Sequence, residues 1–161
     1  MTRTVGVIGA GTMGGAMAKN LIAAGFRVIG RDTSPEREAA LAALRAEIAA
    51  SPRAVADTAE VIITSLPSIT AFEEVIGGPD GIAASEKDGL IVCETSTLPI
   101  EVKDRGRAQL AESGVVLLDT PLSGTGAQAA VKDLVIYASG ETDAIARCTD
   151  VFNSIGRDRK S

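Results

Sequence analysis

The sequence predicts an α/β fold, in which a mostly parallel sheet is doubly wound, with helices on both of its faces. Short apolar stretches typical of buried strands alternate along the chain with stretches that repeat apolar residues at helical spacing. The hydrophobic share is 45%, yet only 2% of the residues are aromatic, so Ala, Val, Ile and Leu must build the core. Those residues suit helices that pack on a parallel sheet.

Local signals place each strand and helix. We expect strands over residues 4–8, 26–29, 46–49, 61–65, 90–93, 115–118 and 134–138. We expect helices over residues 13–24, 99–112, 126–131 and 141–152, and two more that begin at Ser34-Pro35 and Ser51-Pro52. A serine directly before a proline suits a helix start, because serine caps the first turn and proline lacks an amide hydrogen that this turn leaves unpaired.

Chain length and charge restrict what the protein binds. With 161 residues, the chain has the size of one domain that buries roughly two thirds of its unfolded surface. The net charge is −5 and the basic residues form no continuous track, so we expect no nucleic-acid partner. No apolar run reaches the length that crosses a bilayer, and the first residues lack the layout of a signal peptide. We therefore expect no membrane partner and a cytoplasmic location.

The residue types available for chemistry are also restricted. Histidine is absent, which excludes Ser-His-Asp hydrolases, papain-like proteases and metal enzymes with histidine ligands. Cys93 and Cys148 lie far apart in the sequence and have no zinc-like spacing. We expect both to be reduced, buried thiols and expect no metal site.

One loop, between the first expected strand and the first helix, has the pattern G-x-G-x-x-G. Its residues are Gly9, Ala10, Gly11, Thr12, Met13 and Gly14. The first glycine allows a tight turn, the second lets a pyrophosphate approach the backbone, and the third lets the helix pack closely on the strand. The phosphate charge then lies at the helix N-terminus, where unpaired amides and the helix dipole favour an anion. The sequence therefore predicts a dinucleotide-binding domain of the Rossmann type over residues 1–161.

Asp32 follows the second strand, at the separation from Gly14 that is typical of the acid that binds the adenosine ribose. A carboxylate at this position accepts hydrogen bonds from a ribose 2′-hydroxyl and repels a 2′-phosphate, which favours NAD. Arg31 precedes it, and a guanidinium that turned into the site would pair with the 2′-phosphate of NADP. NAD is the expected cofactor, and NADP is the alternative.

Residues 9–21 closely resemble the opening of the β-hydroxyacid dehydrogenases, a family that includes 3-hydroxyisobutyrate, tartronate semialdehyde, L-threonate and 6-phosphogluconate dehydrogenases. Three further segments carry the resemblance. Leu66-Pro67 is similar to the family's turn that lines the cofactor. Residues 94–99 look like its Asp-x-Ser-Thr-x-Pro segment, and residues 119–125 look like its Asp-Ala-Pro-Val-Ser-Gly-Gly segment.

The resemblance implies roles for residues in these segments. Leu66, Pro67 and Thr97 would contact the cofactor, and Ser123 and Gly124 would bind the carboxylate end of a small hydroxy-acid substrate. The implied reaction is hydride transfer between NAD and a short β-hydroxy acid. Thr125 is a departure, because the family has a second glycine there.

In this family the proton donor is a lysine on a long helix of a helical second domain, which also makes the dimer contact. We find neither before residue 161 and assign no catalytic residue in this chain. We therefore expect the N-terminal half of a larger, homo-oligomeric oxidoreductase, inactive by itself. Two alternatives stay open: an NADP-dependent imine or semialdehyde reductase domain, suggested by Arg31 and Thr125, and a nucleotide-sensing module without chemistry.

Overall fold

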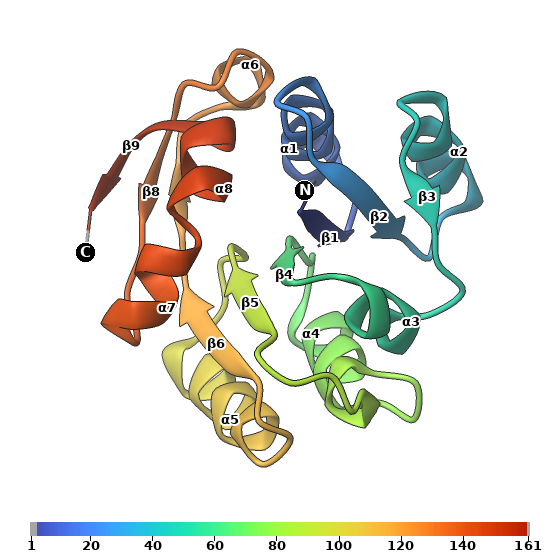
Figure 1. Cartoon of the computed structure of the whole chain (residues 1–161), viewed down its shortest axis with the longest axis vertical. Helices are drawn as coiled ribbons and strands as arrows, with labels where there is room; N and C mark the ends of the chain where they lie inside the picture. Colours follow the sequence, from blue (N-terminus) through green and yellow to red (C-terminus); the bar gives the residue numbers. More distant parts are fainter. Residues whose placement is uncertain (1–2, 161) are drawn as a thin grey trace.

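A six-stranded parallel sheet forms the centre of the protein (Figure 1). The computed structural model describes residues 3–160, and only the backbone of residues 158–160. The strands are β1 (Thr4–Ile8), β2 (Arg27–Arg31), β3 (Glu47–Ile48), β4 (Val61–Thr64), β5 (Ile91–Glu94) and β6 (Val116–Asp119). Their spatial order is β3-β2-β1-β4-β5-β6, and all neighbours are parallel. The order reverses between β1 and β4, which is where open α/β sheets bind ligands.

Helices cover both faces of this sheet and enclose two apolar cores. The helices are α1 (Thr12–Ala23), α2 (Pro35–Ala43), α3 (Pro52–Thr58), α4 (Ile69–Gly77), α5 (Ile100–Ala111), α6 (Gly126–Ala130), α7 (Thr142–Arg147) and α8 (Thr149–Ile155), with a 3-10 turn at Ile82–Ala84. One core includes Met17 of α1, and the other includes Phe72 of α4. Adjacent residues of β4 alternate between them, because Ile63 faces the first core and Ile62 the second. The predicted doubly wound α/β fold is confirmed.

The C-terminal part differs from the expected arrangement. Residues 134–138 contain a strand, β8 (Leu134–Tyr137), but it lies in a second sheet with β7 (Leu122–Ser123) and β9 (Gly156–Lys160). β7 and β8 are antiparallel, so the chain turns back after β6 instead of making another parallel crossover. An isolated bridge between Asp119 and Ser139 joins this part to the end of β6.

Two helical segments also differ from the expectation. The single helix expected over residues 141–152 is divided into α7 and α8 at Cys148, whose φ of −102° and ψ of 5° interrupt the helix. Asp150 then accepts a hydrogen bond from the amide of Val151 in the first turn of α8. Helix α4 was not predicted from the sequence, although Ser68 caps it by accepting a hydrogen bond from the amide of Ala71.

The two cysteines are free and buried, as predicted. The structure brings them together from distant parts of the chain, with 3.9 Å between the Cys93 and Cys148 sulfurs. The hydrogen bond to Cys148 and burial both raise the pKa of the Cys93 thiol. Cys93 is therefore protonated and packs as a small apolar side chain.

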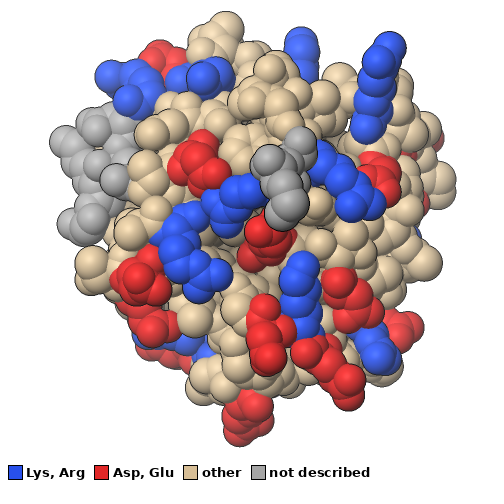
Figure 2. All heavy atoms as spheres, viewed as in Figure 1, with Lys and Arg blue, Asp and Glu red and all other residues tan. Residues whose placement is uncertain are grey.

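Charge is mixed rather than segregated on the face that Figure 2 shows. Figure 2 shows basic and acidic side chains interspersed over one face of the molecule, in keeping with the modest net charge of −5. Among the described residues, no helix has the length and apolar character needed to cross a bilayer.

Candidate dinucleotide site

The loop between β1 and α1 is fixed by close backbone contacts. Gly9 has a φ of +92°, and a Cβ there would lie 2.0 Å from the carbonyl oxygen of Ser65. A Cβ on Gly14 would lie 1.9 Å from the carbonyl oxygen of Gly9. A Cβ on Gly11, by contrast, would have no neighbour nearer than the Arg37 guanidinium at 3.7 Å. The outer two glycines are therefore required by packing, whereas Gly11 leaves the backbone open on the side that faces Arg37.

The N-terminus of α1 is suited to an anion. Gly11 is its N-cap, so no side chain caps the first turn, and this turn contains no acidic residue. The first amides of a helix have no partner within the helix, and the helix dipole adds a partial positive charge to them. A phosphate group placed here would accept hydrogen bonds from these amides.

Asp32 joins this loop to the next helix. Its Oδ2 accepts a hydrogen bond from the amide of Ala10 at 2.7 Å, and its Oδ1 accepts one from the amide of Ser34 at 2.8 Å. The side chain is only 6% exposed. An ionised carboxylate has about four acceptor positions, so two remain for a hydroxyl donor of a ligand. The structure thus brings the predicted acid directly beside the glycine loop.

Two arginines lie near Asp32 and point differently. Arg31 makes an ion pair with Glu38, with 3.3 Å between Nη1 and Oε2. Arg37 lies with Nη1 4.0 Å from Asp32 Oδ2, close to the open side of Gly11. Arg31 was predicted from the sequence as a cofactor-binding residue, whereas Arg37 was not. The helix start at Ser34-Pro35 contained the signal, because it places Arg37 in the first turn of α2, beside the loop.

A cavity of about 380 Å³ opens beside these groups. Its wall includes Gly9, Arg31, Asp32, Arg37, Leu66 and Pro67. The Leu66-Pro67 turn follows β4, and Asp32 follows β2, so the cavity lies over the carboxyl ends of strands on either side of β1. Thr97, Ser123 and Gly124 do not line it; all three are exposed at the ends of more distant strands.

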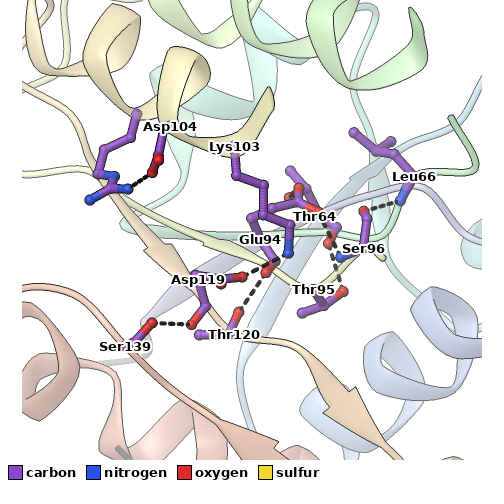
Figure 3. Close-up of polar contacts among 11 residues, drawn as sticks. Thr64, Leu66, Glu94, Thr95, Ser96, Lys103, Asp104, Asp119, Thr120 and Ser139 are labelled. Carbon is purple, nitrogen blue, oxygen red and sulfur yellow. Dashed lines mark hydrogen bonds and ion pairs between the residues drawn. The ribbon is translucent and has the colours of Figure 1, made fainter. Parts of the chain in front are cut away.

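A buried carboxyl group organises those more distant ends (Figure 3). Glu94, the last residue of β5, is fully buried. Its Oε1 accepts a hydrogen bond from the amide of Ser96 at 2.6 Å, and its Oε2 accepts one from the hydroxyl of Thr64. The Ser96 hydroxyl in turn accepts a hydrogen bond from the amide of Leu66 at 2.7 Å. The segment before Thr97 and the Leu-Pro turn are therefore linked.

Burial raises the pKa of Glu94, because a charged carboxylate loses its hydration inside the protein. Hydrogen bonds from Ser96 and Thr64, and the positive charge of Lys103, act in the opposite direction and lower this pKa. Lys103 itself is buried and makes an ion pair with Asp119, with 2.7 Å between Nζ and Oδ1.

The segment after β6 reaches back toward α1. Gly124 has a φ of +146°, and Thr125 caps α6 in a reciprocal capping box with Gln128. A Cβ on Gly126 would lie 2.7 Å from the Thr12 side chain, so this segment passes close to the N-terminus of α1. Thr125, which replaces the second glycine of the resembled motif, therefore serves as a helix cap.

Comparison with known proteins identifies the family. Residues 4–160 match the family described as the NAD binding domain of 6-phosphogluconate dehydrogenase. The chain belongs to this family. This match confirms three predictions made from the sequence: the resemblance to the β-hydroxyacid dehydrogenases, the Rossmann-type fold and a nicotinamide dinucleotide as the cofactor.

Two dehydrogenases match this chain over nearly its whole length. L-threonate dehydrogenase of Cupriavidus necator is 34% identical over 155 residues, which are 96% of this chain and 52% of that enzyme. Mitochondrial 3-hydroxyisobutyrate dehydrogenase of Mus musculus is 33% identical over 152 residues, which are 94% of this chain and 45% of that enzyme. The chain thus spans about half the length of these relatives.

A solved structure agrees with these matches. The Mycobacterium tuberculosis 3-hydroxyisobutyrate dehydrogenase, determined with L-serine, superimposes with a TM-score of 0.92 at 26% identity, covering 99% of this chain and 54% of that one. The NAD-binding domain described above therefore has the fold of the corresponding half of that enzyme.

Proposed function

We propose that the chain holds the cofactor of an oxidoreductase that transfers a hydride between NAD and a short β-hydroxy acid. The observation that carries this proposal is the carboxylate of Asp32, held 2.7 Å from the Ala10 amide beside the uncapped start of α1. This arrangement offers amides to a diphosphate and a carboxylate to the adjoining ribose. The relatives named above, dehydrogenases of L-threonate and 3-hydroxyisobutyrate, support the substrate class.

Each end of the cofactor has proposed contacts in this chain. Gly9, Ala10, Gly11, Thr12, Met13 and Gly14 surround the diphosphate, and Arg31 and Asp32 lie at the adenosine ribose. Leu66, Pro67 and Thr97 lie toward the nicotinamide, and Ser123 and Gly124 orient the substrate's carboxylate. When bound, the nicotinamide ring would accept the hydride from the hydroxy acid, and the reduced ring would return it in the reverse reaction. The role of these residues is to bind and orient the cofactor and the substrate.

The proton donor is proposed to lie outside residues 1–161. No lysine of this chain has the sequence context of the family's donor, and a general acid must lie within about 3 Å of the oxygen that it protonates. We propose that a helical second domain supplies this lysine and the contact between subunits. The 161 residues alone are then expected to bind the dinucleotide without turnover.

A second candidate is an NADP-dependent imine or semialdehyde reductase. The observation that favours it is the guanidinium of Arg37, which lies beside both Gly11 and Asp32 at the place where a 2′-phosphate would enter. Arg31 is less suited to that phosphate, because Glu38 already pairs with it.

Isothermal titration of the chain with NAD, NADP and ADP-ribose tests both candidates. The proposal predicts binding of NAD and ADP-ribose, with NAD tighter than NADP. NADP binding that is about tenfold tighter than NAD, or about 1.4 kcal/mol, would support the reductase instead. A folded chain that binds none of the three would contradict both.

A further inference from the structure

Lys103 occupies an unusual place for a lysine. It lies on α5, its side chain is only 7% exposed, and its ammonium group lies 2.7 Å from Asp119 Oδ1. A buried ammonium is costly unless it is paired, so the position of Lys103 depends on the carboxylates around it. Neither the glycine loop nor the cavity beside Asp32 uses this residue.

Two carboxyl groups on neighbouring strands lie beside this cation, which makes its ion pair with Asp119. Glu94 and Asp119 are the last residues of β5 and β6 and are directly paired in the register of the sheet. Two like charges on adjacent strand positions repel each other, and the Lys103 ammonium offsets that repulsion. Its charge also lowers the pKa of Glu94, although less than the hydrogen bonds from Ser96 and Thr64 do.

Three segments at the substrate end of the sheet meet at Glu94, through its carboxyl group and its backbone carbonyl. Glu94 binds the amide of Ser96, which holds the Leu66-Pro67 turn through its hydroxyl. The Glu94 carbonyl accepts hydrogen bonds from the amide and hydroxyl of Thr120, where the chain leaves β6. Figure 3 shows these groups converging from the ends of β4, β5 and β6. The segments that they hold lead to Thr97 and to Ser123.

We propose that Lys103 is a positioning residue for the nicotinamide half of the site: by neutralising Glu94 and Asp119 together, it holds the segments after β4, β5 and β6 in one arrangement. Lys103 touches neither cofactor nor substrate in this role. The glycine loop and Asp32, which are proposed to hold the adenosine half, share none of the hydrogen bonds or ion pairs of Lys103. The inference rests on the proposed function and adds a division of the site into two separately held halves.

The test compares a whole dinucleotide with a ligand that lacks the nicotinamide. Lys103→Met is titrated with NADH, whose fluorescence reports the surroundings of the reduced ring, and with ADP-ribose. We expect NADH to bind about tenfold more weakly and to lose its fluorescence enhancement at saturation, while the Kd for ADP-ribose stays within about twofold. Lys19→Met, which removes an exposed lysine from α1, is the matched control and should change neither ligand.

Two further variants keep the result decisive if Lys103→Met does not fold. Lys103→Arg retains the charge and is expected to restore the NADH signal. Asp119→Asn is expected to weaken the binding of NADH but not of ADP-ribose, because it removes the ion-pair partner of Lys103 at the end of β6. The proposal would be overturned if all folded variants bound NADH and ADP-ribose more weakly by the same factor, or if neither affinity changed. A wild-type chain that fails to bind ADP-ribose would instead overturn the proposed function.

Discussion

The two ends of the ligand crevice are built in different ways. At the end near β1 and β2, backbone groups dominate: the amides at the start of α1, two glycines that cannot accept a Cβ, and a single carboxylate held by two amides. At the end near β5 and β6, side chains dominate: the buried Glu94 binds Thr64 and Ser96, and the buried Lys103 pairs with the partly exposed Asp119.

The difference determines how each end responds to mutation. A backbone site requires that particular positions carry no side chain, so one added methyl group has a large effect. A side-chain network distributes its function over several partners, and single changes there are expected to alter geometry before they abolish binding. The following experiments test this contrast, from the largest expected effect to the smallest.

Gly14→Ala is expected to have the largest effect. The new Cβ would lie 1.9 Å from the Gly9 carbonyl oxygen, so α1 must move away from β1. We expect a loss of about 2 kcal/mol or more in unfolding free energy, measured by urea denaturation, and no detectable NAD binding. Gly15→Ala is the matched control, because its Cβ would lie 3.4 Å from its nearest neighbour. This variant should retain the wild-type stability and NAD binding. Equal behaviour of the two variants would contradict the packing argument.

Asp32→Ala tests the carboxylate at the backbone-built end. The change leaves the amides of Ala10 and Ser34 without their acceptor, which we expect to cost about 1–3 kcal/mol of stability. NAD affinity should fall about tenfold or more, and NADP affinity should fall less, because its 2′-phosphate no longer meets a carboxylate. Calorimetric titration with both cofactors measures this. An unchanged ratio between the NAD and NADP affinities would show that Asp32 does not contact the adenosine ribose.

Arg37→Ala and Arg31→Ala form a matched pair on the same edge of the crevice. Arg37 faces Asp32 and Gly11, whereas Arg31 pairs with Glu38. We expect Arg37→Ala to weaken NADP about fivefold and Arg31→Ala to change it by less than about twofold. Competition binding with NADP measures both. A larger loss of NADP affinity in Arg31→Ala than in Arg37→Ala would instead support Arg31, as expected from the sequence, as the residue that pairs with the 2′-phosphate.

Glu94→Gln tests the end near β5 and β6 through the pH dependence of stability. Its expected effect is the smallest of the four. Burial raises the pKa of Glu94 above its ordinary value of 4.5, so folding takes up protons between 4.5 and the higher pKa of the folded state. The wild type therefore loses stability relative to Glu94→Gln as the pH rises through this window. Urea denaturation at about pH 4 and about pH 7 measures the difference, with the exposed Glu36→Gln as control. A difference that does not depend on pH would contradict the raised pKa.

The backbone-built end could be predicted from the sequence because its signals are local. Glycines at fixed spacing and an acid at the end of the next strand have one structural solution, and the structure places Asp32 against Ala10 accordingly. The strands of the main sheet were also predicted, most clearly β1, β4 and β5, because fully buried strands are largely continuous apolar runs.

The side-chain-built end could not be predicted in this way. Lys103 appears as an ordinary polar residue of a helix, and only the tertiary fold brings it to Asp119. β7 and β9 are too short or too polar to give a strand signal. At the other end of the crevice, Ser34-Pro35 marked the start of α2, but the proximity of Arg37 to Gly11 also depends on how that helix packs. Residues that function through contacts between distant segments carry no local pattern.

A crystal structure of the chain with NAD bound tests the central claim most directly. The account predicts that diphosphate oxygens lie within about 3 Å of the first amides of α1, and that a ribose hydroxyl donates to Asp32. A dinucleotide ordered elsewhere on the molecule, or a site that stays empty at saturating NAD, would contradict it.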